Sequence, residues 1–191
     1  VDQRTLFENG PVSGDQVRWS TIQADRRVYS VPSRLIGETV RVRRYEDRVE
    51  IFLAGRRQLV MPRLTGEQTH SIRYRDIIEW LIRKPGAFAH YRYRADLFPR
   101  LAFRRAYDRL GKDCSPRTAD MEYLRILRQA AWTMEAEVER VLLELEERGL
   151  TPRWTTLQEF WPPAQPAVAP DLQPLRVDLD AYDALLAEVP S

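Results

Sequence analysis

The chain has 191 residues, 43% of them hydrophobic, and a formal net charge of +2. That content is enough for one domain or two small ones, each with a modest core. No stretch approaches the roughly 18 consecutive apolar residues that a membrane span needs, and the start shows no signal-peptide pattern. We therefore expect no membrane segment. Because the chain starts at Val1 without a Met, we expect a piece of a longer protein.

The small net charge hides an uneven distribution along the chain. Residues 1–110 hold 22 Lys and Arg against 13 Asp and Glu, whereas residues 111–191 hold 8 against 15. Such a split predicts a basic half that binds a polyanion and an acidic half with another partner. Apart from Lys84 and Lys112, every basic residue is Arg. Arginine suits phosphates and bases, although a high-GC genome explains the preference equally well.

Residues 17–65 have the pattern of short antiparallel strands, after a stretch over 1–16 that we expect to be a linker. Alternating apolar and polar residues, interrupted by turn residues at 46–47 and 54–56, indicate hairpins with one dry face. The expected strands cover 29–32, 39–45, 48–53 and 58–61. Because about 45 residues are too few for a large sandwich, a five-stranded SH3-like β-barrel fits the length.

After Gly66 the apolar spacing changes to three and four residues, which predicts a helical domain over 66–161. The expected helices cover about 73–83, 97–110, 121–131 and 134–148, with a short fifth helix opening at 156. In the second helix we expect core contacts from Leu101, Phe103, Ala106, Tyr107 and Leu110. Thr133 is the expected N-cap of the fourth helix and Gly149 its C-terminal stop. Thr156 has the spacing of a capping box with Glu159.

The last segment, 162–191, combines a tether with a short amphipathic pattern. Residues 162–176 contain five prolines, which predicts an extended linker. The residues Leu179, Tyr182, Leu185 and Leu186 then recur at helical spacing among acidic side chains. This pattern is typical of a docking helix; a terminal helix packed on its own domain is the alternative. The whole chain is thus expected to be α+β.

The strongest local feature is the run from Arg83 to Arg94, in which basic and aromatic residues interleave. Cations bind phosphates and rings stack on bases, so this mixture favours nucleic-acid binding. A solvated basic loop with its aromatic rings in the core is the alternative. The candidate DNA contacts are Arg41, Arg43, Arg83, Lys84, Arg92, Arg94, Arg104 and Arg105. We expect most of them to hold the DNA backbone rather than to read bases.

The sequence offers no constellation for catalysis. His70 and His90 have no partners at metal-ligand spacing, and Cys114 is the single cysteine, so we expect no metal site or cofactor in this chain. There is no Gly-rich phosphate loop and no Ser-His-Asp arrangement. A lone cysteine forms no internal disulfide, which points to the reducing cytosol. We therefore expect a binding protein rather than an enzyme.

A series of short motifs carries a family resemblance through its order and spacing. The motifs are Tyr29–Pro32, Arg34–Gly37, Val40–Arg43, Arg83–Phe88, Tyr91–Arg94, Leu97–Pro99, Phe103–Tyr107, Glu122–Leu127 and Leu179–Leu186. Together they resemble the C-terminal region of IstA-type transposases, over roughly residues 17–191. These proteins belong to an insertion-sequence group in which the transposase works with an AAA+ ATPase helper, IstB.

The resemblance implies a role within a larger machine. Full-length members carry a helix-turn-helix region and an RNase H-like core whose DDE carboxylates bind divalent metal, followed by a small β-barrel and a helical region. This chain would lie downstream of that core, so no catalytic residue is carried over. The expected partners are transposon-end and possibly target DNA, further protomers in a synaptic complex at the nucleoid, and the ATPase helper. A purely protein–protein assembly module with little DNA contact is the alternative.

Overall fold

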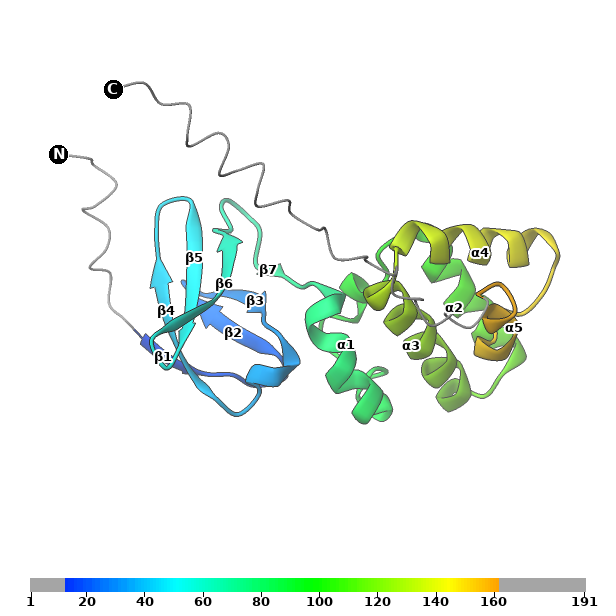
Figure 1. The fold of residues 1–191 in the computed structure, drawn as a ribbon, viewed down its shortest axis with the longest axis horizontal. Coiled ribbons are helices and arrows are strands. Elements are labelled where there is room, and N and C mark those ends of the chain that lie inside the picture. Colours follow the sequence, from blue (N-terminus) through cyan, green and yellow to red (C-terminus); the bar gives the residue numbers. More distant parts are fainter. Residues whose placement is uncertain (1–12, 162–191) are drawn as a thin grey trace, which may run out of the picture. The chain divides into compact units, whose positions relative to one another are not determined.

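The computed structural model describes residues 13–161. They form an α+β fold in which a β-rich region precedes a set of helices (Figure 1), so the predicted class and order are confirmed. Within these residues no helix has the length and apolar character needed to cross a membrane. The predicted tail with its docking helix lies outside the described residues, and so does most of the predicted N-terminal linker.

The described strands form two small sheets. One sheet has the order β1-β4-β5-β6, with every pair antiparallel, and the other has the order β2-β3-β7, in which β3 and β7 run parallel. The strands are β1 (Ser13–Gln16), β2 (Thr21–Ala24), β3 (Arg27–Ser30), β4 (Thr39–Arg44), β5 (Arg48–Leu53), β6 (Arg56–Pro62) and β7 (His70–Ser71). The sequence predicted a five-stranded barrel, whereas the described residues form seven strands.

Strand β1 corrects the linker that was expected over 1–16. Its sequence, Ser-Gly-Asp-Gln, has no apolar residue to reveal an alternation. The strand exists because it pairs with β4, with Gly14 opposite Arg41 and Gln16 opposite Thr39. Pairing with a distant strand leaves no local signal in the sequence, so only the β4 half of this ladder was predictable.

Tight turns with positive φ connect several strands. Ala54 and Gly55, at φ 48° and 78°, lie at the predicted turn between β5 and β6. Two positive φ values in a two-residue loop match the twist of the flanking strands. Trp19 and Ser20 adopt the same conformation, at φ 56° and 58°, just before β2. A tryptophan in this region is unusual because its Cβ is strained there.

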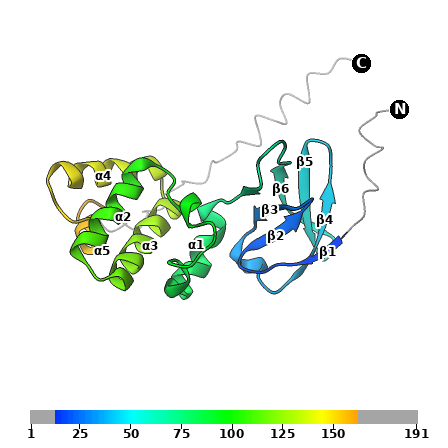
Figure 2. The ribbon, with the colours of Figure 1, turned by 180° about the vertical axis from the view of Figure 1, so that it is seen from behind.

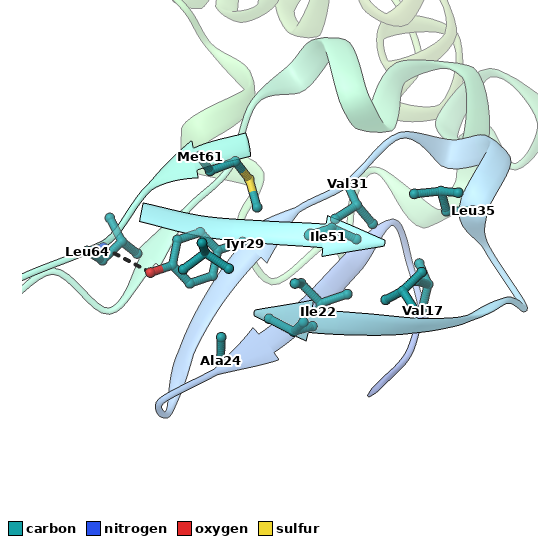
Figure 3. Close-up of a cluster of buried hydrophobic side chains, with 12 residues drawn as sticks. Val17, Ile22, Ala24, Tyr29, Val31, Leu35, Ile51, Met61 and Leu64 are labelled. Carbon is teal, nitrogen blue, oxygen red and sulfur yellow. Dashed lines mark hydrogen bonds between the residues drawn. The ribbon is translucent and has the colours of Figure 1, made fainter. Parts of the chain in front are cut away.

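Both sheets contribute to one hydrophobic core (Figure 3). Val40 and Val42 of β4 and Val49 and Ile51 of β5 are buried, as their alternation predicts. Tyr29 of β3 lies in this core and is only 1% exposed. Its hydroxyl accepts a hydrogen bond of 2.9 Å from the backbone amide of Leu64, the dashed line in Figure 3. The phenol thereby fastens the chain that leaves β6 to the centre of the core.

The helical part is built around one long helix, which contacts all the others (Figure 2). The helices are α1 (Tyr74–Arg83), α2 (Leu101–Asp113), α3 (Pro116–Trp132), α4 (Glu135–Glu147) and α5 (Trp154–Gln158), and α3 is the central one. Short 3₁₀ turns occupy Ser33–Leu35, Pro85–Ala87 and Arg94–Leu97. Gly149, at φ 66°, follows the C-cap of α4 as predicted.

Three local expectations for the helices were wrong. Thr133 closes α3, where its hydroxyl donates to the carbonyl of Gln129, and Met134 is the N-cap of α4. Thr156 lies inside α5, whose N-cap is Arg153, so there is no capping box. Leu101 is 64% exposed because α2 starts only there, after an extended Arg100. In each case the residue type was right for its predicted role but the helix end was misplaced.

An aromatic cluster fills the core of the helical part. Phe88, Phe98, Tyr107 and Tyr123 contact one another with ring centroids 5.0–6.2 Å apart. Tyr123 donates its hydroxyl to the carbonyl of Leu97, and Tyr107 donates to the carboxylate of Asp120 at 2.7 Å. Burial, and then the bond to Asp120, raise the pKa of Tyr107 to about 12. These phenols therefore stay neutral hydrogen-bond donors.

A buried polar network joins the β-rich region to α1. The carboxylate of Asp76, in the first turn of α1, accepts a hydrogen bond of 2.6 Å from Ser30 of β3. The Ser30 hydroxyl in turn accepts the backbone amide of Arg73, whose guanidinium binds the same carboxylate. Ser33 donates to the backbone carbonyl of Asp76 at 2.6 Å. Asp76 thus orients the first helix against the strands.

Replacing Ser30 by Ala should destabilise the fold. It leaves a buried carboxylate oxygen and the Arg73 amide without their shared partner, which costs about 1–3 kcal/mol of unfolding free energy. Urea unfolding of the two proteins measures the difference. Thr65→Ala is the control, because Thr65 is exposed and such surface changes stay within about 0.5 kcal/mol. Equal stability of Ser30→Ala and the parent would contradict the role given to this network.

Alkaline pH should weaken the fold through the buried phenols. Unfolded Tyr107 ionises near pH 10, whereas the folded protein holds its pKa at about 12. Its stabilising contribution is therefore complete below pH 10 and is lost as pH rises from 10 to 12. Tyr107→Phe should make the fall in unfolding free energy over that window shallower. A fall as steep in the variant as in the parent would assign the alkaline sensitivity to other groups.

Candidate nucleic-acid interface

The outer face of the four-stranded sheet gathers four arginines, Arg41, Arg43, Arg48 and Arg57, which we call the sheet-face cluster. In the strand register Arg43 lies opposite Glu50, and Phe52 lies between Arg41 on β4 and Arg57 on β6. Since directly opposed residues share a face, these side chains emerge on the side away from the valines of the core. The cluster therefore follows from the pairing of β4, β5 and β6.

A single carboxylate lies beneath this cluster. Glu50 is 4% exposed, and its Oε1 accepts the Arg48 Nε at 2.9 Å and lies 3.5 Å from the Arg57 Nη1. The hydrogen bond to Glu50 is the main cause of the raised pKa of Arg48. Glu50 and the exposed Asp47, which also pairs with Arg48, balance only two of the four guanidinium groups, so the face keeps a net positive charge. Such a surface attracts a polyanion.

Arg41 and Arg43 are the members of the cluster that Glu50 does not hold. Both are exposed, and within residues 13–161 neither forms an ion pair with an acidic side chain. The Arg43 guanidinium lies over the Phe52 ring, 4.8 Å from its centroid. A hollow of about 440 Å³ opens beside them, floored in part by Gly14, which has no side chain. These two predicted contacts are well placed for phosphate. The next residue, Arg44, pairs with Asp25.

A second surface, which we call the aromatic groove, lies where the start of β2, α1 and the loop after α1 meet. Its aromatic lining consists of Trp19, Trp80, Tyr91 and Tyr93, and its charged and polar lining includes Asp15, Arg18, His90 and Arg92. Its volume is about 570 Å³. The rings form a chain, with centroids 5.5 Å apart for Trp19 and Trp80, 6.0 Å for Trp80 and Tyr91, and 5.9 Å for Tyr91 and Tyr93.

The basic–aromatic run from Arg83 to Arg94 divides between this groove and the core. Phe88 is fully buried, and the Arg94 guanidinium packs over the rings of Phe88 and Tyr107 at 4.8 Å from each centroid. Tyr91 and Arg92, in contrast, line the groove. The structure thus places part of the run in the core, as the alternative expected, and leaves Tyr91 and Arg92 at the groove, since the loop turns every few residues between its 3₁₀ segments. Nucleic-acid binding by this run stays a prediction.

The remaining predicted contacts lie in other places. Arg83 donates its Nε to the backbone carbonyl of Glu79 within α1, and Lys84 is exposed at the end of that helix. Arg104 pairs with Asp108 and Arg105 with Glu146, both inside the helical part. The structure thus brings Arg41 and Arg43 together but does not unite the eight predicted residues in one surface. Their contact with DNA stays a prediction.

Four residues of the two surfaces were missed from the sequence. Arg48 and Arg57 share a face with Arg43, and the turns at 46–47 and 54–56 held the signal, because a hairpin turn fixes which residues oppose each other. Trp19 and Trp80 had no such signal. They are 61 positions apart in the sequence, and only the packing of α1 on the strands brings them together.

No group of three or more potential metal ligands occurs in the part of the chain that the structure describes. His70 Nε2 lies 3.1 Å from the Asp96 carboxylate, and the imidazole packs against Tyr93 with centroids 4.8 Å apart. Cys114 is a partly buried free thiol at the end of α2. His70 and Cys114 therefore form no metal site with other described residues.

A protein-family model matches the β-rich region of the chain. The family model described as "Mu transposase, C-terminal domain" matches residues 17–72, the segment that holds β2 to β7. The match supports a transposase C-terminal region.

A curated relative covers more of the chain. The uncharacterized protein y4jA/y4nE/y4sE of Sinorhizobium fredii (strain NBRC 101917 / NGR234) is 34% identical over 167 residues, which are 83% of this chain and 32% of that protein. The chain therefore spans about a third of the length of this relative. No solved structure matches the chain.

Proposed function

We propose that this chain is the DNA-binding and assembly region of an IstA-type DNA transposase. The observation that carries the proposal is the sheet-face cluster, because its exposed arginines lie within the segment that the transposase family model matches. In this proposal the chain makes no bonds itself. A catalytic core elsewhere in the longer protein, with its divalent metal, performs strand transfer at transposon ends, in the cytoplasm at the nucleoid.

The two free arginines of the cluster bind the DNA backbone in this proposal. Arg41 and Arg43 are two positions apart on one strand, so both guanidinium groups face the same side. Arginine binds phosphate with two parallel hydrogen bonds and releases condensed counterions when it does so. Both arginines lie on a strand, so they are not on a helix that could enter a major groove. We therefore expect binding that depends on salt more than on sequence.

The double substitution Arg41→Gln and Arg43→Gln should weaken binding to a transposon-end duplex and to a random duplex alike. The loss should be roughly tenfold or more at low salt, and the slope of log affinity against log salt should become shallower by about 2, or 1 for each lost phosphate contact. Fluorescence anisotropy over a salt series measures both quantities.

The matched control is the double substitution Arg140→Gln and Arg148→Gln. It removes the same charge from α4, where both arginines pair with Glu144, and should leave DNA affinity nearly unchanged. If the two double variants lost affinity equally, the effect would come from net charge alone. If neither did, the sheet face would not be the DNA surface.

A role in assembly is the second candidate, and it concerns the helical part. Arg100 pairs with Glu135 and Glu139, Arg109 with Asp113, and Arg128 with Glu79, so these arginines are engaged within the chain. Exposed apolar side chains occur in the same part, with Leu101 at 64% and Met134 at 63%. Apolar exposure with neutralised charge is typical of a protein contact. It favours contact between protomers of a synaptic complex.

The C-terminal tail is the proposed docking segment for the AAA+ helper. Leu179, Tyr182, Leu185 and Leu186 supply one apolar stripe in an acidic setting after a proline-rich stretch, and a helix this short folds on contact with a partner. Removing residues 170–191 should abolish binding to an IstB-type ATPase while leaving duplex affinity nearly intact. A pull-down beside the anisotropy assay tests this. Retained ATPase binding, or loss of the fold, would show that the tail has another role.

A further inference from the structure

The aromatic groove has the chemistry of a site for an unpaired nucleobase. We propose that it holds a base splayed out of the DNA, stacked on Trp19, with the flanking phosphate bound by Arg18 and Arg92. This inference rests on the proposed function, since it specifies a second mode of contact with the same ligand. It concerns a surface that shares no lining residue with the hollow of the sheet face.

Trp19 is the residue that singles out this groove. Its side chain is 60% exposed, and its backbone lies at φ 56°, where Gly or Asn is the usual residue. Most of the indole is left in water at this turn, yet the backbone that carries it is strained. Strain of this kind is concentrated at ligand sites.

The turn also holds Trp19 in a fixed place. Arg18 and Thr21 exchange two backbone hydrogen bonds across it, and the Thr21 hydroxyl donates to the Arg18 carbonyl at 2.8 Å. Trp80, which is 7% exposed, supports the indole of Trp19 at 67° between the ring planes. A preorganised ring loses little freedom when it stacks on a ligand, which favours affinity.

Tyr91 contributes an unsatisfied polar atom to the same groove. Its hydroxyl is buried and has no hydrogen-bond partner within the part of the chain that the structure describes. Burial is the main cause that raises the pKa of Tyr91 above its ordinary value, so the phenol stays a neutral donor. Buried hydroxyls nearly always have a partner. A base would supply one only if the Tyr91 ring turned toward the groove, because the hydroxyl is buried here.

The charges of the groove select for phosphate. Among residues 13–161, Arg18 makes one side-chain hydrogen bond, to the neutral Gln16 amide, and Arg92 lies over the Tyr93 ring at 5.6 Å from its centroid. The carboxylate of Asp15 accepts the backbone amide of Gln23 at 2.8 Å, and it is one negative charge against the two guanidinium groups of the lining. Two guanidinium groups beside a row of rings suit a nucleotide, whose base stacks while its phosphate meets a cation.

Stacking on a ring requires a base that has left the duplex, because paired bases are covered on both faces by their neighbours. The groove therefore fits single-stranded or flipped nucleotides and not intact duplex. A proline-rich peptide also binds aromatic grooves, and this chain contains one at 162–176. That segment carries no charge up to Pro170 and a single carboxylate, Asp171, before Arg176, so it offers the two arginines of the groove little negative charge. The observations favour the nucleotide.

The test compares two ligands on the full chain. One is an oligothymidylate of about ten nucleotides, within the range of known single-strand sites, and the other is a blunt duplex. The variant is Trp19→Gly, which removes the ring and suits the positive φ. Relief of backbone strain offsets the lost contact with Trp80, so the thermal midpoint should stay close to that of the parent. We expect single-strand affinity to fall about 5- to 100-fold, while duplex affinity changes less than twofold.

Trp132→Ala is the matched control, because Trp132 is 70% exposed but lies at the end of α3, outside the groove. It should leave oligothymidylate affinity unchanged. Oligothymidylate should also quench tryptophan fluorescence in the parent and in Trp132→Ala more strongly than in Trp19→Gly, a readout specific to stacking.

Three results would overturn the proposal, and they are distinguishable. Unchanged oligothymidylate affinity in Trp19→Gly, with the duplex loss of Arg41→Gln and Arg43→Gln intact, would remove the groove and keep the proposed function. Loss of binding to a peptide of residues 162–176 in Trp19→Gly, without loss of oligothymidylate, would assign the groove to the proline-rich segment. Absence of binding to either DNA by the parent chain would reject both proposals.

Discussion

The arrangement of the aromatic groove depends on the carboxylate of Asp76. It lies at the start of α1, where an acidic group also favours the helix dipole, and it takes hydrogen bonds from Ser30 on β3 and from the Arg73 guanidinium. A buried carboxylate is costly unless every lone pair finds a donor, so this contact has essentially one acceptable geometry. It holds α1 against the strands, and this placement brings Trp80 of α1 to Trp19 at the groove.

A second buried carboxylate, Glu50, organises the sheet face in a different way. Asp76 is surrounded by donors from two elements and joins them, whereas Glu50 is covered by arginines of its own sheet. It holds Arg48 and Arg57 and leaves Arg41 and Arg43 free. The two basic residues that the sequence placed on this face are thus the ones that the structure leaves available. Arg48 and Arg57 therefore neutralise and cover Glu50, whereas Arg41 and Arg43 remain available to a ligand.

The parts of the fold that were predictable from the sequence are those with a local period. The alternation in β4 and β5 and the three-to-four spacing in α1 each reflect one buried face, and they gave the strands, the helices and their order. Strand β1 and the Trp19 turn were not predictable, because the first depends on pairing with β4 and the second on packing against α1. The same limit applies to the basic–aromatic run from Arg83 to Arg94, whose composition indicated binding. Only the structure shows that Phe88 and Arg94 pack in the core while Tyr91 and Arg92 line the groove.

The turn that exposes Trp19 also buries the next residue, Ser20. Ser20 is fully buried, and its hydroxyl donates to Ser33 at 3.2 Å, which donates in turn to the backbone carbonyl of Asp76. Two hydrogen bonds, from Ser20 to Ser33 and from Ser33 to Asp76, therefore connect the turn that carries the indole to the start of α1. The same hydrogen-bonded pair of serines thus supports both the display of the indole and the seating of α1 on the strands.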